Sequence, residues 1–263
     1  MAINKYYHFG KIYLKNSYTN LFEKMFRGFT IAIILFIFIN IWKTIYSGRT
    51  IIDGFTIKDL IWYLAMSELI TFSTGTERIE DISDEVKSGL ISNSLSKPIN
   101  YVLKELAILY ANFIYNFLVI GIFAFSLAYL FVGLIDLSII NIPVLIIIIL
   151  LGATINFLII ITLGLFSFWI EDSLSLAWIY HKAILILGGT LIPLNFYPDW
   201  IKNYLYILPT SFITFFPSKL FVNFNLNDLY FAIIGSISWI IILGLFLFFV
   251  YKIGIKKVSI NGG

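Results

Sequence analysis

The chain contains no cysteine, only two histidines and little charge. It has 263 residues, of which 13% are charged. Without cysteine there is no disulfide, thiolate metal site or cysteine nucleophile. Two histidines cannot supply three histidine ligands to one metal ion. A soluble domain of this length would need about twice the charged fraction to cover its surface. The composition therefore predicts that residues 1–263 form one transmembrane domain.

Sequence motifs for nucleotide binding and catalysis are also missing. There is no G-x-x-x-x-G-K-[ST] phosphate loop, no H-E-x-x-H and no G-x-S-x-G. Glu171, Asp172 and His181 are too few for a membrane-enzyme site and lack metal-ligand spacing. No basic cluster is dense enough to indicate nucleic-acid binding. We therefore expect no catalytic residue, metal site or cofactor in this chain, and interpret it as a conduit or a subunit driven by another protein.

Long apolar stretches fill most of the chain, and hydrophobic residues make up 60% of it. About 20 apolar residues suffice to cross a bilayer as a helix. The sequence predicts an all-α integral membrane protein with six transmembrane helices. The second is the least apolar. The expected spans are 29–47, 57–76, 106–132, 143–170, 175–194 and 229–251.

The segments between these spans alternate between rich and poor in lysine and arginine. If the N-terminus is inside, the inner segments hold 13 of the 18 lysines and arginines. Short cytoplasmic segments carry this excess in membrane proteins. We therefore predict a multi-pass protein of the cytoplasmic (inner) cell membrane, with both termini and the tail 252–263 in the cytoplasm. No cleavable signal peptide is expected, because no small-residue cleavage site follows the first apolar run.

Residues 5–27 have the pattern of an amphipathic helix lying in the headgroup region. Its aromatic side has Tyr6, Phe9 and Tyr13, and its basic side has Lys11 and Lys15. A membrane anchor and a helix that contacts a partner both fit this pattern.

Residues 77–105 lie between the second and third spans on the inner side, and their first part has helical spacing. Gly89 is placed to end this helix in a left-handed conformation, with Leu90 as the accompanying hydrophobic contact. The helix is expected to be acidic with one apolar stripe of Ile79, Ile82, Val86 and Leu90; its charged residues include Glu80, Asp81, Asp84, Glu85 and Lys87. It is either a solvated loop helix or a docking element for a soluble partner, and the stripe favours docking.

Residues 192–219 lie on the outer side and are too apolar for a loop and too rich in proline for a straight span. They predict short re-entrant or interfacial helices with a proline near each boundary. An interfacial aromatic belt and a lid over an outward pathway are both possible readings. The candidate gate residues are Pro193, Phe196, Pro198, Trp200, Pro209, Phe215 and Pro217.

Glu68 is the ionisable residue expected deepest in the membrane, near the middle of the second span. A carboxylate at that depth is costly and should face the bundle interior or a water-filled cavity. It either lines a pathway or is a protonated or hydrogen-bonded packing residue.

Several segments together resemble the permease subunit of type-2 ATP-binding-cassette (ABC) exporters, and most closely a six-span bacterial and archaeal branch. The run from Ile79 to Leu90, followed by Lys97 and Pro98, is similar to the coupling segment of these permeases. Glu68 departs from the resemblance, since a neutral residue is expected there. The other similar segments keep the same order: 168–172, 191–200, 208–209, 216–219, 254–257 and 262–263.

The resemblance implies a permease that forms a translocation pathway as a dimer, with a second copy or a related permease. A separate ABC ATPase would bind beneath it and carry the ATP and Mg²⁺. Residues 5–27 would then be the interface helix, 77–97 would dock into the ATPase, and 193–219 would form the outer gate.

The cargo is left open by the sequence. Sparse charge and dense outer aromatics suit export (efflux) of an amphipathic or lipophilic compound such as a drug, peptide or lipid. Export of a polysaccharide or lipid-linked glycan is an alternative. An ion-coupled secondary transporter that uses Glu68 is a third hypothesis, ranked low because only the C-terminal half shows broken helices.

Overall fold

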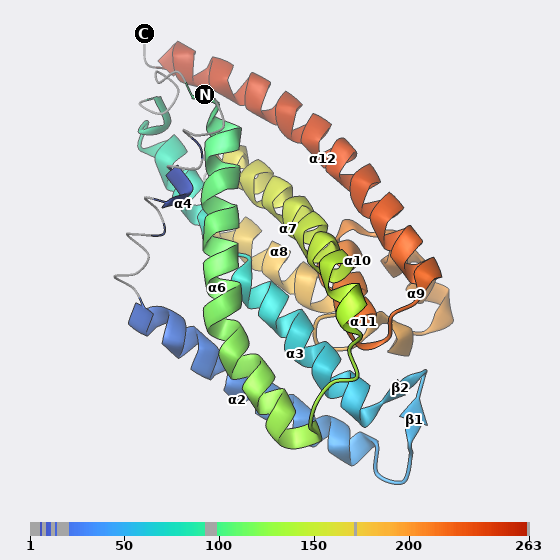
Figure 1. Cartoon of the computed structure of the whole chain (residues 1–263). Coiled ribbons are helices and arrows are strands. Elements are labelled where there is room, and N and C mark those ends of the chain that lie inside the picture. Colours follow the sequence, from blue (N-terminus) through green and yellow to red (C-terminus); the bar gives the residue numbers. More distant parts are fainter. Residues whose placement is uncertain are drawn as a thin grey trace.

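The computed structural model describes residues 6, 9–11, 14, 21–92, 99–170 and 173–261, and these are almost entirely helical. Figure 1 shows long helices running side by side, with short helices at both ends of the bundle. The helices are α2 (Leu21–Ile45), α3 (Ile57–Ser73), α4 (Arg78–Lys87), α6 (Tyr101–Val132), α7 (Ile142–Leu165), α8 (Ser173–Leu187), α9 (Asp199–Ile207), α10 (Pro209–Ile213), α11 (Phe215–Val222) and α12 (Leu226–Asn261). The 3-10 turns are η2 (Ile139–Asn141), η3 (Phe166–Phe168) and η4 (Leu194–Phe196), and the strands are β1 (Ile51–Ile52) and β2 (Phe55–Thr56).

Among the residues that the structure describes, four helical segments are long and apolar enough to cross a membrane: Met25–Ile45, Tyr101–Val132, Ile139–Phe168 and Leu226–Lys257. They correspond to the expected first, third, fourth and sixth spans, which confirms an all-α integral membrane protein. The expected second and fifth spans correspond to the shorter helices α3, with 17 residues, and α8, with 15.

Helix α3 is enclosed by the rest of the bundle. Its side chains are buried continuously from Leu60 to Thr71, and it contacts α2, α6 and α11. Thr56 and Asp59 form a capping box that fixes its start. Its polar side chains therefore face protein rather than lipid, which explains how the least apolar of the six stretches can lie in the interior.

Several boundaries differ from the sequence-based expectation. Helix α2 begins at Leu21, so the end of the expected interface helix over 5–27 belongs to the first long helix. Helix α6 begins at Tyr101 and includes the end of the expected coupling segment. Helix α8 ends at Leu187, where the chain turns through Gly189 with a φ of 74°. Within the described residues, capping and packing fix where these helices begin and end. The apolar pattern of the sequence does not contain that information.

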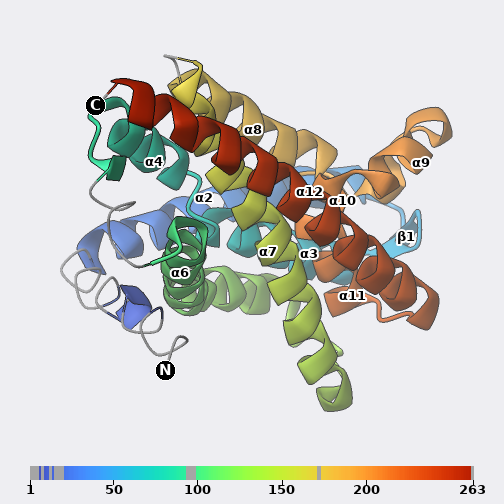
Figure 2. The same cartoon turned by 90° about the horizontal axis from the view of Figure 1, so that it is seen from above.

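The two ends of the bundle are built differently. The β1–β2 hairpin and helices α9 and α11 gather at one end, and α4 lies at the other end beside the C-terminus of α12 (Figures 1 and 2). Each proline of 192–219 lies at a helix start: Pro193 precedes η4, Pro198 precedes α9, Pro209 begins α10, and Pro217 is in the first turn of α11. We call these the outer and inner ends, following the predicted orientation.

Candidate functional site

Helix α4 lies across the inner end of the bundle, in contact with α7, α8 and η3 (Figure 2). It spans Arg78–Lys87, and Gly89 follows with a φ of 74°, in the left-handed region that glycine adopts without strain. The expected helix and its glycine stop are therefore confirmed. Leu90, expected to pack beside Gly89, is 57% exposed instead.

Apart from the exposed Leu90, the apolar stripe of α4 packs within this chain. Ile79 and Ile82 are fully buried, and Val86 packs against the core. The close approach depends on Gly164 of α7, because a Cβ added there would lie 2.7 Å from the Cβ of Ile82. The stripe is therefore not the docking surface that the sequence suggested, because α7 already covers it.

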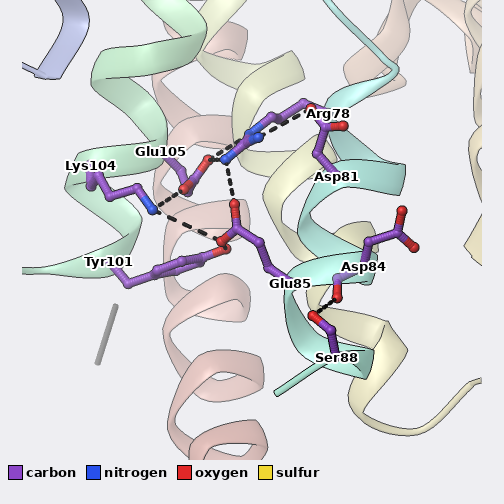
Figure 3. Close-up of polar contacts among 8 residues, drawn as sticks. All are labelled: Arg78, Asp81, Asp84, Glu85, Ser88, Tyr101, Lys104 and Glu105. Atoms are coloured by element: carbon purple, nitrogen blue, oxygen red, sulfur yellow. Dashed lines mark hydrogen bonds and ion pairs between the residues drawn. The ribbon is translucent and has the colours of Figure 1, made fainter. Parts of the chain in front are cut away.

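Arg78, at the start of α4, is the centre of an ion-pair network shown in Figure 3. Its Nε and Nη2 atoms both lie 2.8 Å from Oε2 of Glu105, a fully buried side chain of α6. Arg78 also donates to Glu85, at 3.0 Å, and to Asp81, at 3.1 Å. One guanidinium thus joins two carboxylates of its own helix to a third on α6.

Lys104 and Tyr101 of α6 extend this network. The Nζ of Lys104 lies 3.0 Å from Oε1 of Glu105, and the hydroxyl of Tyr101 donates to Glu85 at 3.1 Å. The Tyr101 ring stacks on Tyr251 of α12, with centroids 6.2 Å apart. We call the six residues Arg78, Asp81, Glu85, Tyr101, Lys104 and Glu105 the inner charge cluster.

The charges of the inner charge cluster hold Arg78 in its ionised form. Burial opposes the charged form, but Glu105 and Glu85 outweigh it and raise the pKa of Arg78 above its usual range. A buried ion pair is weak evidence for stability, but loss of one partner leaves an uncompensated buried charge. The cluster therefore behaves as a unit that fastens α4 to α6.

A further ion pair joins α4 to the first long helix. Glu77, directly before α4, accepts from Arg27 of α2 at 3.0 Å. Packing and ion pairs together attach α4 to α2, α6 and α7. A force applied to α4 would therefore act on three long helices at once.

The solvent-facing side of α4 is polar and mainly acidic. Asp81 and Asp84 are exposed, Glu80 is partly exposed, and the exposed Lys87 lies near the C-terminal end of the helix. The exposed Leu90 follows at the tip. This face is open in the described chain and has the charge and the apolar tip that a protein partner can recognise.

The other expected site residues are distributed over the bundle. Glu68 is 2% exposed on α3, and its Oε2 has no hydrogen-bond partner. Phe215 is fully buried, whereas Trp200 is 74% exposed on α9. Of the expected interface helix, Tyr6 accepts from the backbone N–H of Asn100 at 3.1 Å. Phe9 is partly exposed and Lys11 is exposed. Four expected residues, Tyr13, Lys15, Lys97 and Pro98, lie outside the described residues.

The described residues contain no group of three or more histidine, cysteine, aspartate or glutamate side chains that could hold a metal ion. Four of the acidic groups at the inner end, Glu77, Asp81, Glu85 and Glu105, are instead paired with Arg27, Arg78 or Lys104. These ion pairs connect α4 to α2 and α6.

Comparison with protein families decides the class of the chain. The family model described as ABC-2 family transporter protein matches residues 29–262. The chain belongs to this family. Among curated proteins, none matches the chain. As an ABC-2 permease, the chain is the membrane component of an ABC transporter. Membership of this family implies a separate ABC ATPase as its partner.

Sequence reasoning missed the ABC-2 permease residues that fasten α4 to the bundle. Arg27, Arg78 and Lys104 were counted only as inner positive charges, and Glu105 and Gly164 were not singled out. One signal was available for Glu105: a carboxylate one residue after a lysine at the start of an apolar helix needs a cationic partner when buried. Its pairing with Arg78, however, depends on the packing of α4 against α6.

Proposed function

We propose that this chain is the membrane-spanning subunit of an ABC exporter, that it forms the translocation pathway as a dimer, and that α4 receives the motion of the ATPase. The observation that carries this proposal is the attachment of α4. Its apolar side and its inner charge cluster are bound to α2, α6 and α7, while its acidic side is open. A helix attached in this way is suited to transmit movement from a soluble partner to the bundle.

The partner ATPase carries the ATP and Mg²⁺ in this proposal, and the present chain has no cofactor of its own. Both termini and α4 are on the cytoplasmic side of the inner cell membrane. The second permease in the dimer is either another copy or a related chain. Lipids surround the exposed apolar side chains of α2, α6 and α12.

The proposed cargo is an amphipathic or lipophilic compound such as a drug, a peptide or a lipid. The support comes from the outer segment, where Trp200 is 74% exposed and Tyr204 is 73% exposed on α9. Aromatic and apolar surfaces bind such molecules without a dense set of charges. A polysaccharide or lipid-linked glycan remains the alternative cargo, because sugar rings also stack on aromatic side chains.

The docking role of α4 can be tested by changing exposed residues that do not hold the fold together. Asp84→Lys and Leu90→Asp alter the open face and tip of α4, so we expect at least a tenfold loss of the co-purified ATPase, about 1.4 kcal/mol in binding. The controls are Asp136→Lys, which removes only a surface ion pair with Lys58 at the start of α3, and Ile51→Asp in the exposed strand β1 at the outer end. Detergent pull-down followed by mass spectrometry gives the readout. Equal ATPase recovery from all four variants would refute docking through α4.

An ion-coupled secondary transporter is the second candidate function, because Oε2 of Glu68 is buried without a hydrogen-bond partner. Glu68→Gln keeps the size of the side chain and removes its ability to bind and release a proton. The ABC proposal expects ATP-driven transport in proteoliposomes to persist in this variant without an ion gradient. Transport that requires a proton gradient and disappears in Glu68→Gln would favour the secondary transporter.

A further inference from the structure

An apolar groove lies near the inner end of α12, where α7 gives way to η3. One wall is formed by Phe166, Trp169 and Ile170, and the other by Phe249, Val250 and Ile253 of α12. Its volume is about 390 Å³. Trp169, Phe249 and Ile253 are each more than 40% exposed, so the groove opens outward from the bundle.

The base of the groove is fixed by close packing. A Cβ added to Gly254 of α12 would lie 2.3 Å from Cδ2 of Phe168, so the η3 turn can approach α12 only at a glycine. Lys257 donates to the backbone oxygen of Phe168 at 3.4 Å, and the rings of Phe166 and Phe246 meet edge to face. The shape of the groove is therefore fixed by contacts between the η3 turn and α12.

One lysine of α12, Lys257, lies beside the groove. The Nζ of Lys257 lies 5.3 Å from the centre of the Trp169 ring, and Lys252 and Lys256 are exposed on the same last turns. Within the described part of the chain, no carboxylate lies within ion-pair distance of Lys252 or Lys257. These cations lie at the end of a membrane-spanning segment, at the depth of lipid headgroups.

A second apolar groove on α12 provides a comparison. It lies toward the outer end, is lined by residues including Phe212, Ile234 and Trp239, and has a volume of about 340 Å³. The lysine near that end of α12, Lys219, is paired with Asp228 at 2.9 Å. Of these two grooves, the inner one thus combines an apolar surface with a cation, Lys257, that is not matched by a described carboxylate.

We propose that the inner groove binds an anionic phospholipid. An acyl chain lies against the walls of Trp169, Phe249 and Ile253, and the headgroup phosphate lies beside Lys257. Basic pockets at the cytoplasmic ends of membrane helices attract anionic headgroups, and the apolar groove provides the surface for a chain. This proposal requires that the chain spans a membrane, and it does not depend on which cargo the chain transports.

The test is a lipid titration of the purified full chain, in whatever complex it purifies, followed by native mass spectrometry. The two probes are phosphatidylglycerol and phosphatidylcholine with the same acyl chains. We expect phosphatidylglycerol to bind about fivefold more tightly, which is the effect of one lysine near an anionic headgroup. Lys257→Gln should reduce this preference to less than about twofold.

Lys43→Gln is the matched control, because Lys43 also lies over an aromatic ring, that of Phe131, but belongs to the other end of the bundle. It should leave the preference unchanged. Ile253→Trp should fill the groove and weaken phosphatidylglycerol binding with the lysines intact. Glycerol phosphate, which has no acyl chains, should not compete. Equal binding of the two lipids, a preference that survives Lys257→Gln, or competition by glycerol phosphate would each overturn the proposal.

Discussion

Arg78 shows how one side chain can determine the position of a helix. Its guanidinium contacts Asp81, Glu85 and Glu105, and the last of these is fully buried on another helix. The planar fork of arginine can reach several carboxylates at once, which the single ammonium of lysine cannot do with the same geometry. The position of α4 on α6 therefore depends on this residue being arginine.

Arg78→Gln should destabilise the protein strongly, because it leaves the buried carboxylate of Glu105 without its main cation. We expect a loss of about 3–5 kcal/mol in the free energy of unfolding. The measurement is unfolding by SDS titration in mixed micelles. Arg49→Gln, an exposed change at the other end of the bundle, should stay within about 0.5 kcal/mol of the wild type.

The double variant Arg78→Met/Glu105→Leu tests the reason for that loss. Replacing a buried pair by apolar residues of similar size is often neutral, whereas removing one partner is not. We expect the double variant to be clearly more stable than Arg78→Gln. An Arg78→Gln protein as stable as the wild type would show that the ion pair does not hold α4 in place.

At the scale of elements, the contact between α4 and α7 depends on a glycine. A Cβ at Gly164 would meet the Cβ of Ile82 at 2.7 Å and the backbone oxygen of Ile79 at 3.3 Å. Neither atom is the free end of a flexible chain, so α4 itself would have to move. Small residues serve the same purpose at helix contacts in membranes generally.

Gly164→Ala should therefore weaken the protein even though alanine favours a helix by about 1 kcal/mol over glycine. Gly244→Ala on α12 is the matched control, because no atom lies within 4 Å of the added Cβ. We expect a lower melting temperature and weaker coupling of ATP hydrolysis to transport for Gly164→Ala only. Identical behaviour of the two variants would mean that α4 does not need this close approach.

At the scale of the whole molecule, the inner and outer ends should lie on opposite sides of the membrane. The chain contains no cysteine, so a single introduced cysteine can be labelled without background. Ser47 and Ser92 are both exposed, and serine to cysteine is a small change. Ser47 lies toward the hairpin end and Ser92 follows α4.

Ser47→Cys should react with a membrane-impermeant maleimide in intact cells, and Ser92→Cys should react only after the membrane is permeabilised. The fraction labelled in each case is read from a gel shift. The reverse pattern would mean that the orientation is inverted, and labelling of both in intact cells would place the two ends on one side.

The sequence by itself determined the class, the long helices and the existence of α4. Apolar length, lysine and arginine distribution, proline placement and the stop at Gly89 are local properties, and local properties are sufficient for these conclusions. The run from Ile79 to Leu90 and the segments after it carry the resemblance to type-2 ABC permeases, and the family match confirms that the chain belongs to this class.

Only the tertiary structure decided which surfaces are available. It buried Ile79 and Ile82 against Gly164, exposed Leu90, enclosed the polar helix α3 and paired Arg78 with Glu105, which is 27 positions away. The hydrophobic pattern of α4 shows that one side is apolar, but it does not say whether that side meets its own bundle or a partner. That choice depends on how distant helices pack, because burial is a property of both surfaces in contact.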